Sequence, residues 1–278
     1  MISSVIKYLL FVLIFLRISF AQQYLDAQFK TASNLYDNGD YFNAITEFKR
    51  LLFFDEQNKY SFIGNMYLGK SYKGGAFLDD AIKYFSLAKK YTTDSEGFYQ
   101  SQTEIIRCNI LRRTIPKAFQ LIKELEDDSR FTDKKNDLIY WRAWAYIFAD
   151  DWESAAGEFE KIDKNHELKA FCNDVAGQKF SGTLLVLASA IIPGFGQIYT
   201  GNEFSGILSL AWCGLFGYLS INSFYADRIF DGFVYTGLFL RFHRGNIQNV
   251  NKFVKQENIA ISNRALEYLQ YKFAGLKP

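Results

Sequence analysis

The middle of the chain carries an apolar pattern that recurs every 37 residues. Four alanines mark it, and an apolar residue follows each alanine four positions later and precedes it by three. These offsets share one face of a helix with 3.6 residues per turn. The pattern therefore predicts four amphipathic helices, each preceded by another apolar helix. The columns are Tyr41, Ala44 and Phe48; Leu78, Ala81 and Phe85; Ile115, Ala118 and Ile122; and Trp152, Ala155 and Phe159.

Turn residues separate the two helices that we expect in each copy. Asn38-Gly39-Asp40, Gly74-Gly75 and Asp150-Asp151 provide them in the first, second and fourth copies. The third copy departs from the pattern. Ile106 stands where a small residue is expected, and Pro116 lies near the start of the second helix. Proline is tolerated in a first helical turn, so the third copy stays in the prediction.

The second copy resembles the tetratricopeptide repeat. The matching residues are Leu68, Gly69, Tyr72, Ala81, Phe85 and Ala88, and the resemblance covers about residues 24–165. It implies stacked helix-turn-helix units whose first helices line a concave surface that binds a protein or peptide partner. A purely structural spacer is the alternative. The period exceeds the family's ~34 residues, so we expect longer connections.

Beyond Lys179 the chain becomes apolar. Residues 181–202 and 204–226 carry no charge, and Glu203 alone separates them. The second run is long enough to span a bilayer. A third, shorter run from Phe233 to Leu240 ends at Arg241. The pattern predicts a transmembrane helical hairpin, with a buried hairpin of a soluble protein as the alternative. If the first run is re-entrant, two helices span and the tail returns to the side of the repeats.

A proline- and glycine-rich motif interrupts the first apolar run, and it should break a helix there. The segment resembles a small bacterial membrane domain marked by P-G-x-G-Q-x-Y-x-G, over about residues 181–255. We expect the glycines to form turns and the glutamine and tyrosine to make hydrogen bonds at the membrane interface. The motif residues are Pro193, Gly194, Gly196, Gln197, Tyr199 and Gly201.

The N-terminus is typical of an export signal. A short segment with one lysine precedes an apolar run, and Ala21 fits a cleavage site. An uncleaved anchor helix is the alternative. Export would place the repeats in the bacterial cell envelope, on the periplasmic side.

The chemistry-bearing residues predict a protein without an enzymatic role. We find no nucleophile–base pair, no supported carboxylate pair and no metal-ligand cluster in the sequence, so we expect no cofactor and no metal. With 32 basic and 30 acidic residues, the charge gives no sign of a nucleic-acid partner. Gly64 to Ser71 matches the phosphate-loop pattern G-x-x-x-x-G-K-[ST]. The repeat already explains this segment as the middle of a helix, so we expect no nucleotide there.

The sequence thus predicts an all-α fold in four parts: a signal peptide (1–21), four tetratricopeptide-like repeats (22–175), a membrane-embedded helical domain (181–255) and an amphipathic tail (256–278). The expected function is a membrane-anchored periplasmic scaffold that binds protein or peptide partners and membrane lipid, with envelope assembly as its context. The alternative is a small channel-like subunit with the repeats as a collar. Its pore could use Gln197, Asn222 and Arg241.

Overall fold

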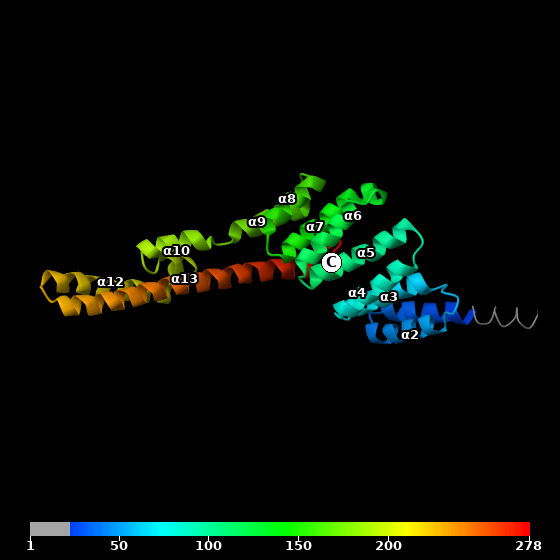
Figure 1. Cartoon of the computed structure of the whole chain (residues 1–278), viewed down its shortest axis with the longest axis horizontal. Helices are drawn as coiled ribbons and strands as arrows, with labels where there is room; N and C mark the ends of the chain where they lie inside the picture. The colour runs from blue at the N-terminus through cyan, green and yellow to red at the C-terminus, as the bar shows by residue number, and fades with distance from the viewer. Residues whose placement is uncertain (1–22) are drawn as a thin grey trace, which may run out of the picture. The chain divides into compact units, whose positions relative to one another are not determined.

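The computed structural model describes residues 23–278, and these fold entirely into helices and connecting turns (Figure 1). The predicted signal peptide lies outside the described residues. The chain divides into two compact units, Met1–Ala170 with Pro278 and Phe171–Lys277. Unit 1 contains a helix over residues 23–37, α2 (Tyr41–Phe54), α3 (Ser61–Gly74), α4 (Leu78–Tyr91), α5 (Ser95–Leu111), α6 (Ile115–Glu126), the 3₁₀ helix η1 (Ser129–Lys134), α7 (Lys135–Phe148) and α8 (Trp152–Ile162).

In unit 1 helices pack on their neighbours in the sequence and form four pairs, the first of which joins Ala32 of the helix over 23–37 to Ala44 and Phe48 of α2. We call the helix over 23–37, α3, α5 and α7 the first helices, and α2, α4, α6 and α8 the second helices. Pro116 lies in the first turn of α6, where its missing N–H leaves no helical hydrogen bond unmade. The predicted all-α, repeat-like fold is therefore present in this unit.

The same turn closes all four first helices. In each, a residue with positive φ ends the helix, and the next amide N–H donates to the carbonyl five residues earlier at 2.9–3.0 Å. This is the Schellman arrangement. The 37-residue period thus exists in the backbone as well as in the side chains. The residues with positive φ are Gly39, Ala76, Arg113 and Asp150, and the donors are Asp40, Phe77, Thr114 and Asp151.

The small residues of the repeat lie where two helices approach closely. The four alanines of the second helices are 0% exposed, as are three of the four large residues that follow them. Gly69 in α3 shows how tight the contact is, because a Cβ added there would lie 2.7 Å from the ring of Phe85. The buried set is Ala44, Phe48, Ala81, Phe85, Ala118, Ile122, Ala155 and Phe159.

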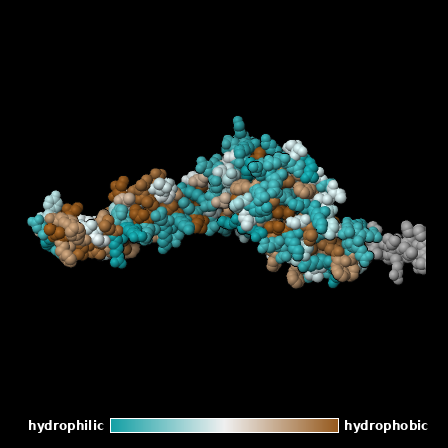
Figure 2. Space-filling model, viewed as in Figure 1, coloured by the Kyte–Doolittle hydropathy of each residue, from teal (hydrophilic) through white to brown (hydrophobic). Residues whose placement is uncertain are grey.

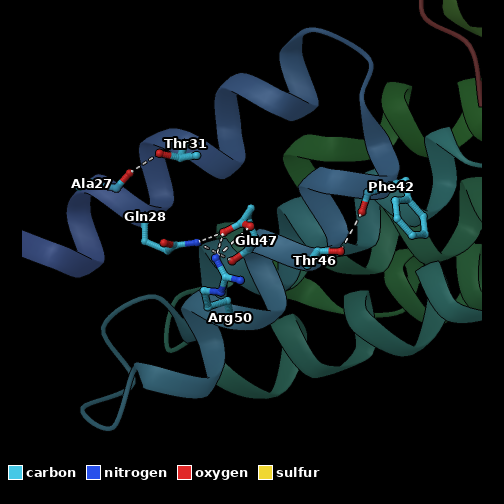
Figure 3. A network of polar contacts seen from close by, with 7 residues as sticks. All are labelled: Ala27, Gln28, Thr31, Phe42, Thr46, Glu47 and Arg50. Carbon is cyan, nitrogen blue, oxygen red and sulfur yellow. Dashed lines mark hydrogen bonds and ion pairs between the residues drawn. The ribbon is translucent and has the colours of Figure 1, made fainter.

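A polar network joins the first two helices (Figure 3). The amide of Gln28 donates to the carboxylate of Glu47 in α2, and Arg50 forms an ion pair with the same carboxylate at 3.0 Å. The hydroxyls of Thr31 and Thr46 donate hydrogen bonds to backbone carbonyls four residues earlier in their own helices. This pair therefore combines an apolar core with a half-exposed charged edge.

Unit 2 contains most of α9 (Glu167–Gln178), then α10 (Gly182–Ile191), the short α11 (Phe195–Tyr199), α12 (Glu203–Tyr225) and α13 (Ile229–Tyr271). α12 and α13 pack as an antiparallel pair. Ser220 and Thr236 share a hydrogen bond at 2.6 Å near the turn, and Trp212 stacks on Phe242 further along. The predicted break in the first apolar run is present, since α10 ends before Pro193.

α13 differs from the expectation. The sequence predicts that an apolar helix stops at the cations after Leu240 and that a separate amphipathic helix forms the tail from residue 256. The structure has one helix of 43 residues. The physical reason is that a change from apolar to charged residues alters the environment a helix prefers but does not end the helix. Arginine, lysine and glutamine all have high helix propensity. No proline interrupts this stretch, and Gly245 is tolerated inside it.

The segment that matches the phosphate-loop pattern, Gly64 to Ser71, lies within α3. A phosphate loop needs free amide N–H groups that point at one site. In this helix the amides serve the helical hydrogen bonds instead. Lys70 of the pattern places its ammonium over the ring of Tyr67, 5.2 Å from the centroid.

Candidate functional site

The first helices of unit 1 bring polar side chains together across repeats. α3 contacts α5, and α5 contacts α7. Residues that stand 37 apart therefore occupy equivalent places on one surface. One row holds Tyr67, Glu104 and Trp141, and a second holds Lys70, Arg107 and Trp144. We call the side of these helices that carries the two rows the first-helix face. Tyr67, Lys70 and Arg107 are partly exposed on it, whereas Trp141 and Trp144 are buried.

A cluster of charges lies on the first-helix face, and we call Lys73, Glu104, Arg107 and Trp141 the charged cluster. The Lys73 ammonium donates to one oxygen of Glu104 at 2.8 Å, and Arg107 pairs with the other oxygen. The Arg107 guanidinium also lies over the indole of Trp141, 5.0 Å from the ring. Three successive first helices thus contribute to one network.

Two cations share the Glu104 carboxylate in this cluster. The side chains are 10–18% exposed, which leaves little water to screen them. Burial lowers the pKa of Lys73, and the neighbouring Glu104 opposes that shift. The arrangement suits an acceptor on a partner, such as a carboxylate or a backbone carbonyl, next to aromatic rings.

Cys108 follows Arg107 in α5 and is fully buried. Burial raises the pKa of its thiol to about 12, and the same cause raises that of Cys172 to about 12. Both thiols therefore remain protonated at neutral pH and are poor nucleophiles.

The sequence columns identify the packing of unit 1 but not its polar face. The structure places the predicted alanines and aromatic residues between the helices, and Gly69 also lies there. Tyr41 and Tyr72 are half-buried, and Trp152 is buried. The charged cluster was missed because a search for apolar columns ignores charges. The signal that could have found Arg107 is the basic residue Lys70 one 37-residue period before it.

In unit 2 the proline–glycine motif forms a tight polar junction that we call the Pro-Gly turn (residues 192–201). Gly194 has φ of +91°, and a Cβ there would lie 2.1 Å from the carbonyl oxygen of Gly206. Asn246 of α13 accepts from the Gly194 amide at 2.8 Å and donates to the carbonyl of Ser189 at 2.8 Å. The Ser189 hydroxyl accepts from the Gly196 amide at 2.7 Å. The side chains of Ser189 and Asn246 thus replace the hydrogen bonds that the helix break removes.

The remaining motif residues divide between the interior and the surface of unit 2. Gln197 is 0% exposed, and its amide donates to Ser209 of α12 at 2.9 Å. Tyr199 is exposed and stacks on Phe195, while Gly201 has φ of +78° and ends α11. Gln197 therefore ties α11 to α12 from within the unit.

The three polar residues considered for a pore do not share one environment. Gln197 is enclosed between α11 and α12, whereas Asn222 and Arg241 lie on the surface of unit 2. The structure does not bring these three side chains together around one common space.

Apolar side chains cover the surface of unit 2. Figure 2 shows brown atoms gathered over α10 and over the end where α12 turns into α13. α12 is long and apolar enough to cross a membrane, and only 17% of its apolar window is buried within the protein. It is the one such helix among residues 23–278. The most exposed of the apolar residues include Ile191, Phe204, Tyr218, Tyr225, Phe230 and Phe233.

Within the described part of the chain, no group of three or more histidine, cysteine, aspartate or glutamate side chains is placed to hold a metal ion. No family model, no curated protein and no solved structure matches this chain.

Proposed function

We propose that this protein is a membrane-anchored scaffold of the bacterial cell envelope. In this proposal unit 1 is a tetratricopeptide-type repeat array that binds a protein or peptide, and unit 2 holds it at the bilayer. The export signal predicted at the N-terminus would place unit 1 in the periplasm.

One observation carries the proposal, and it is the exposure of α12. A helix of this length and apolarity in a soluble protein would be covered by other helices, because exposed apolar area costs about 25 cal/mol per Å². Here most of its window faces outward. A lipid environment removes that cost, so membrane insertion accounts for the surface that the fold leaves uncovered.

The binding role rests on the first-helix face. Aromatic residues and arginine are the side chains most often used as anchors in protein interfaces. The face presents the partly exposed Tyr67 and Arg107, and the buried Trp141 packs under the Arg107 guanidinium. The cationic side chains of Lys73 and Arg107 favour a partner segment that presents carboxylates or carbonyl oxygens.

The anchor is tested by extraction of membranes from cells that express the full chain. Sodium carbonate at alkaline pH removes peripheral proteins and leaves inserted ones. We expect the wild-type chain in the pellet, and a variant with Leu208→Arg and Leu215→Arg in α12 in the supernatant. Release of the wild-type protein by carbonate would contradict insertion.

The binding face is tested by photo-crosslinking in cells. A photoreactive amino acid at Lys70 probes the first-helix face, and the same amino acid at exposed Lys83 in α4 probes a second helix as a matched control. We expect a discrete crosslinked product from position 70 that Arg107→Ala weakens. Equal products from both positions, or none from position 70, would exclude this face as the partner site.

A further inference from the structure

A basic stripe runs along one side of α13. It consists of Arg241, Arg244, Lys252 and Lys255, which are all exposed. At about 100° per residue they fall within an arc of about 80°, and at 1.5 Å per residue they extend over about 21 Å. No aspartate or glutamate lies within ion-pair distance of these four among the described residues. The acidic residues of α13 lie off this arc: Asp231, Glu257 and Glu267.

The stripe faces away from the rest of unit 2. Asn246, Val250 and Val254 point toward α10 and the Pro-Gly turn, and they lie on the opposite side of α13. Phe242, which stacks on α12, is also outside the arc. The four cations are therefore not used to hold the fold together.

Part of the basic stripe lies beside the apolar helix α12. Phe242 stacks on Trp212 and Phe216, so Arg241 lies at the level of the middle of α12. At an equal rise in both helices, Lys252 lies near the level of Glu203, where α12 begins. The stripe thus begins at the polar end of the apolar helix and continues about 16 Å along it.

We propose that this basic stripe binds the phosphate of acidic phospholipids at the end of the bilayer where α12 begins. Lys252 and Lys255 lie at or beyond the level where α12 begins. Arg241 and Arg244 lie deeper along α12, need an anionic partner there, and extend their long side chains toward the headgroups. Basic sites next to membrane helices bind acidic headgroups by this means. The inference rests on the proposed insertion of α12.

A phospholipid fits this surface better than a soluble acidic partner does. The stripe is bordered on α13 by exposed Phe233, Val234 and Leu240. A lipid offers a phosphate to the cations and an acyl chain to these apolar residues in one molecule. A soluble acidic segment could reach Lys252 and Lys255, but it would have to enter the apolar layer to meet Arg241.

Trp212 provides a probe at the right place. It is 42% exposed, and it stacks on Phe242, the neighbour of Arg241. The other tryptophans, Trp141, Trp144 and Trp152, are buried in unit 1. Brominated phospholipids quench tryptophan fluorescence on contact, so quenching reports the lipid that lies beside Trp212.

The experiment uses the full chain reconstituted into bilayers that contain brominated phosphatidylglycerol or brominated phosphatidylcholine. We expect stronger quenching by phosphatidylglycerol in the wild type. Arg241→Gln with Arg244→Gln should lower the preference for phosphatidylglycerol by about fivefold or more, whereas Arg241→Lys with Arg244→Lys should retain most of it. Arg264→Gln in the distal part of α13 with Lys272→Gln directly after the helix removes the same charge and should leave the preference unchanged. Circular dichroism confirms that each variant is folded.

The outcomes separate this inference from the proposed function. Quenching by both lipids to the same extent would support insertion and overturn the lipid site. Quenching by neither would overturn both. A preference that survives in the Gln variant would remove the two arginines from the site. Loss of an oligomer in that variant, with equal quenching by both lipids, would show that a second copy of the chain covers the stripe instead.

Discussion

The two units of this protein use different means to bring helices together. Unit 1 repeats one turn four times, and in three of its four copies a small buried residue of the first helix stands in register with a large one of the second. Unit 2 has a single junction, in which the backbone at Gly194 approaches the backbone at Gly206 and Asn246 holds the broken helix. Side chains can adjust to a substitution, whereas two backbones in contact cannot. The comparison predicts that unit 2 is the more sensitive to single changes in its glycines.

The largest effect should follow Gly194→Ala. The new Cβ would meet the Gly206 carbonyl oxygen at 2.1 Å, and φ of +91° disfavours any L-residue. We expect a loss of about 3 kcal/mol or more in stability, measured as the thermal midpoint of the full chain in detergent by circular dichroism. Gly201→Ala is the matched control. It has φ of +78° but open space around it, so it should cost only about 1–2 kcal/mol. Equal losses would remove the backbone contact as the cause.

A smaller loss is expected for Gly69→Ala in unit 1. Its Cβ would lie 2.7 Å from the ring of Phe85, and a ring can shift where a carbonyl cannot. We expect a loss of about 1–3 kcal/mol, and recovery of part of it when Phe85→Leu is added. Tryptophan fluorescence in a Trp212→Phe background follows the unfolding of unit 1 alone. Gly157→Ala in α8, where nothing lies within 4 Å, should instead stabilise the helix slightly. Independent, additive effects of the changes at 69 and 85 would contradict the contact.

These contacts show how far the sequence predicts the fold. The alanine columns and the 37-residue period predict the helix pairs of unit 1, because close packing of each pair requires residues of a particular size at the same position in every copy. The third copy is explained only with the structure in view. Ile106 and Ile122 are both buried at the register where the second copy has Gly69 and Phe85, so a larger residue on one helix accompanies a smaller one on the other. When each position is compared with the repeat pattern separately from its packing partner, Ile106 counts as a mismatch.

The sequence is less informative about unit 2 and about the candidate sites. The helix break at Pro193 could be predicted from proline and glycine. The role of Asn246 could not, because its partners at Ser189 and Gly194 lie more than 50 residues away. The continuity of α13 through Arg241 also escaped prediction, since a change from apolar to charged residues looks like an end of the element. The charged cluster needs three helices in place before Glu104 meets both of its cations.

A gain in stability should follow Ala76→Gly. Ala76 ends α3 with φ of +64°, whereas the first copy has Gly39 in the equivalent place. Glycine removes the free-energy cost of holding an L-residue in the left-handed conformation. That gain exceeds the cost of the extra conformational entropy that glycine gives the unfolded chain, so we expect a net gain in stability of about 0.5–1 kcal/mol. Gly39→Ala should show the opposite sign and a loss of about 1 kcal/mol. Chemical denaturation in the same Trp212→Phe background measures both. If Ala76→Gly destabilises unit 1, the four turns are not energetically equivalent.

The smallest effect concerns the pH dependence of the charged cluster. Burial lowers the pKa of Lys73 below 10.5, so the folded protein releases this proton at a lower pH than the unfolded chain does. Stability contributed by this group therefore rises with pH from the lowered pKa up to 10.5 and is constant above it.

Tyr99, buried and hydrogen-bonded to Asp137, has a raised pKa, so its contribution to stability is present below pH 10 and is lost as pH rises above it. We expect the free energy of unfolding of the wild type, relative to Lys73→Met, to increase across the first window. The same difference relative to Tyr99→Phe should decrease above pH 10. Denaturant titrations at a series of alkaline pH values measure both differences. A decrease of the Lys73 difference as pH rises would show that Glu104 stabilises the ammonium more than burial penalises it.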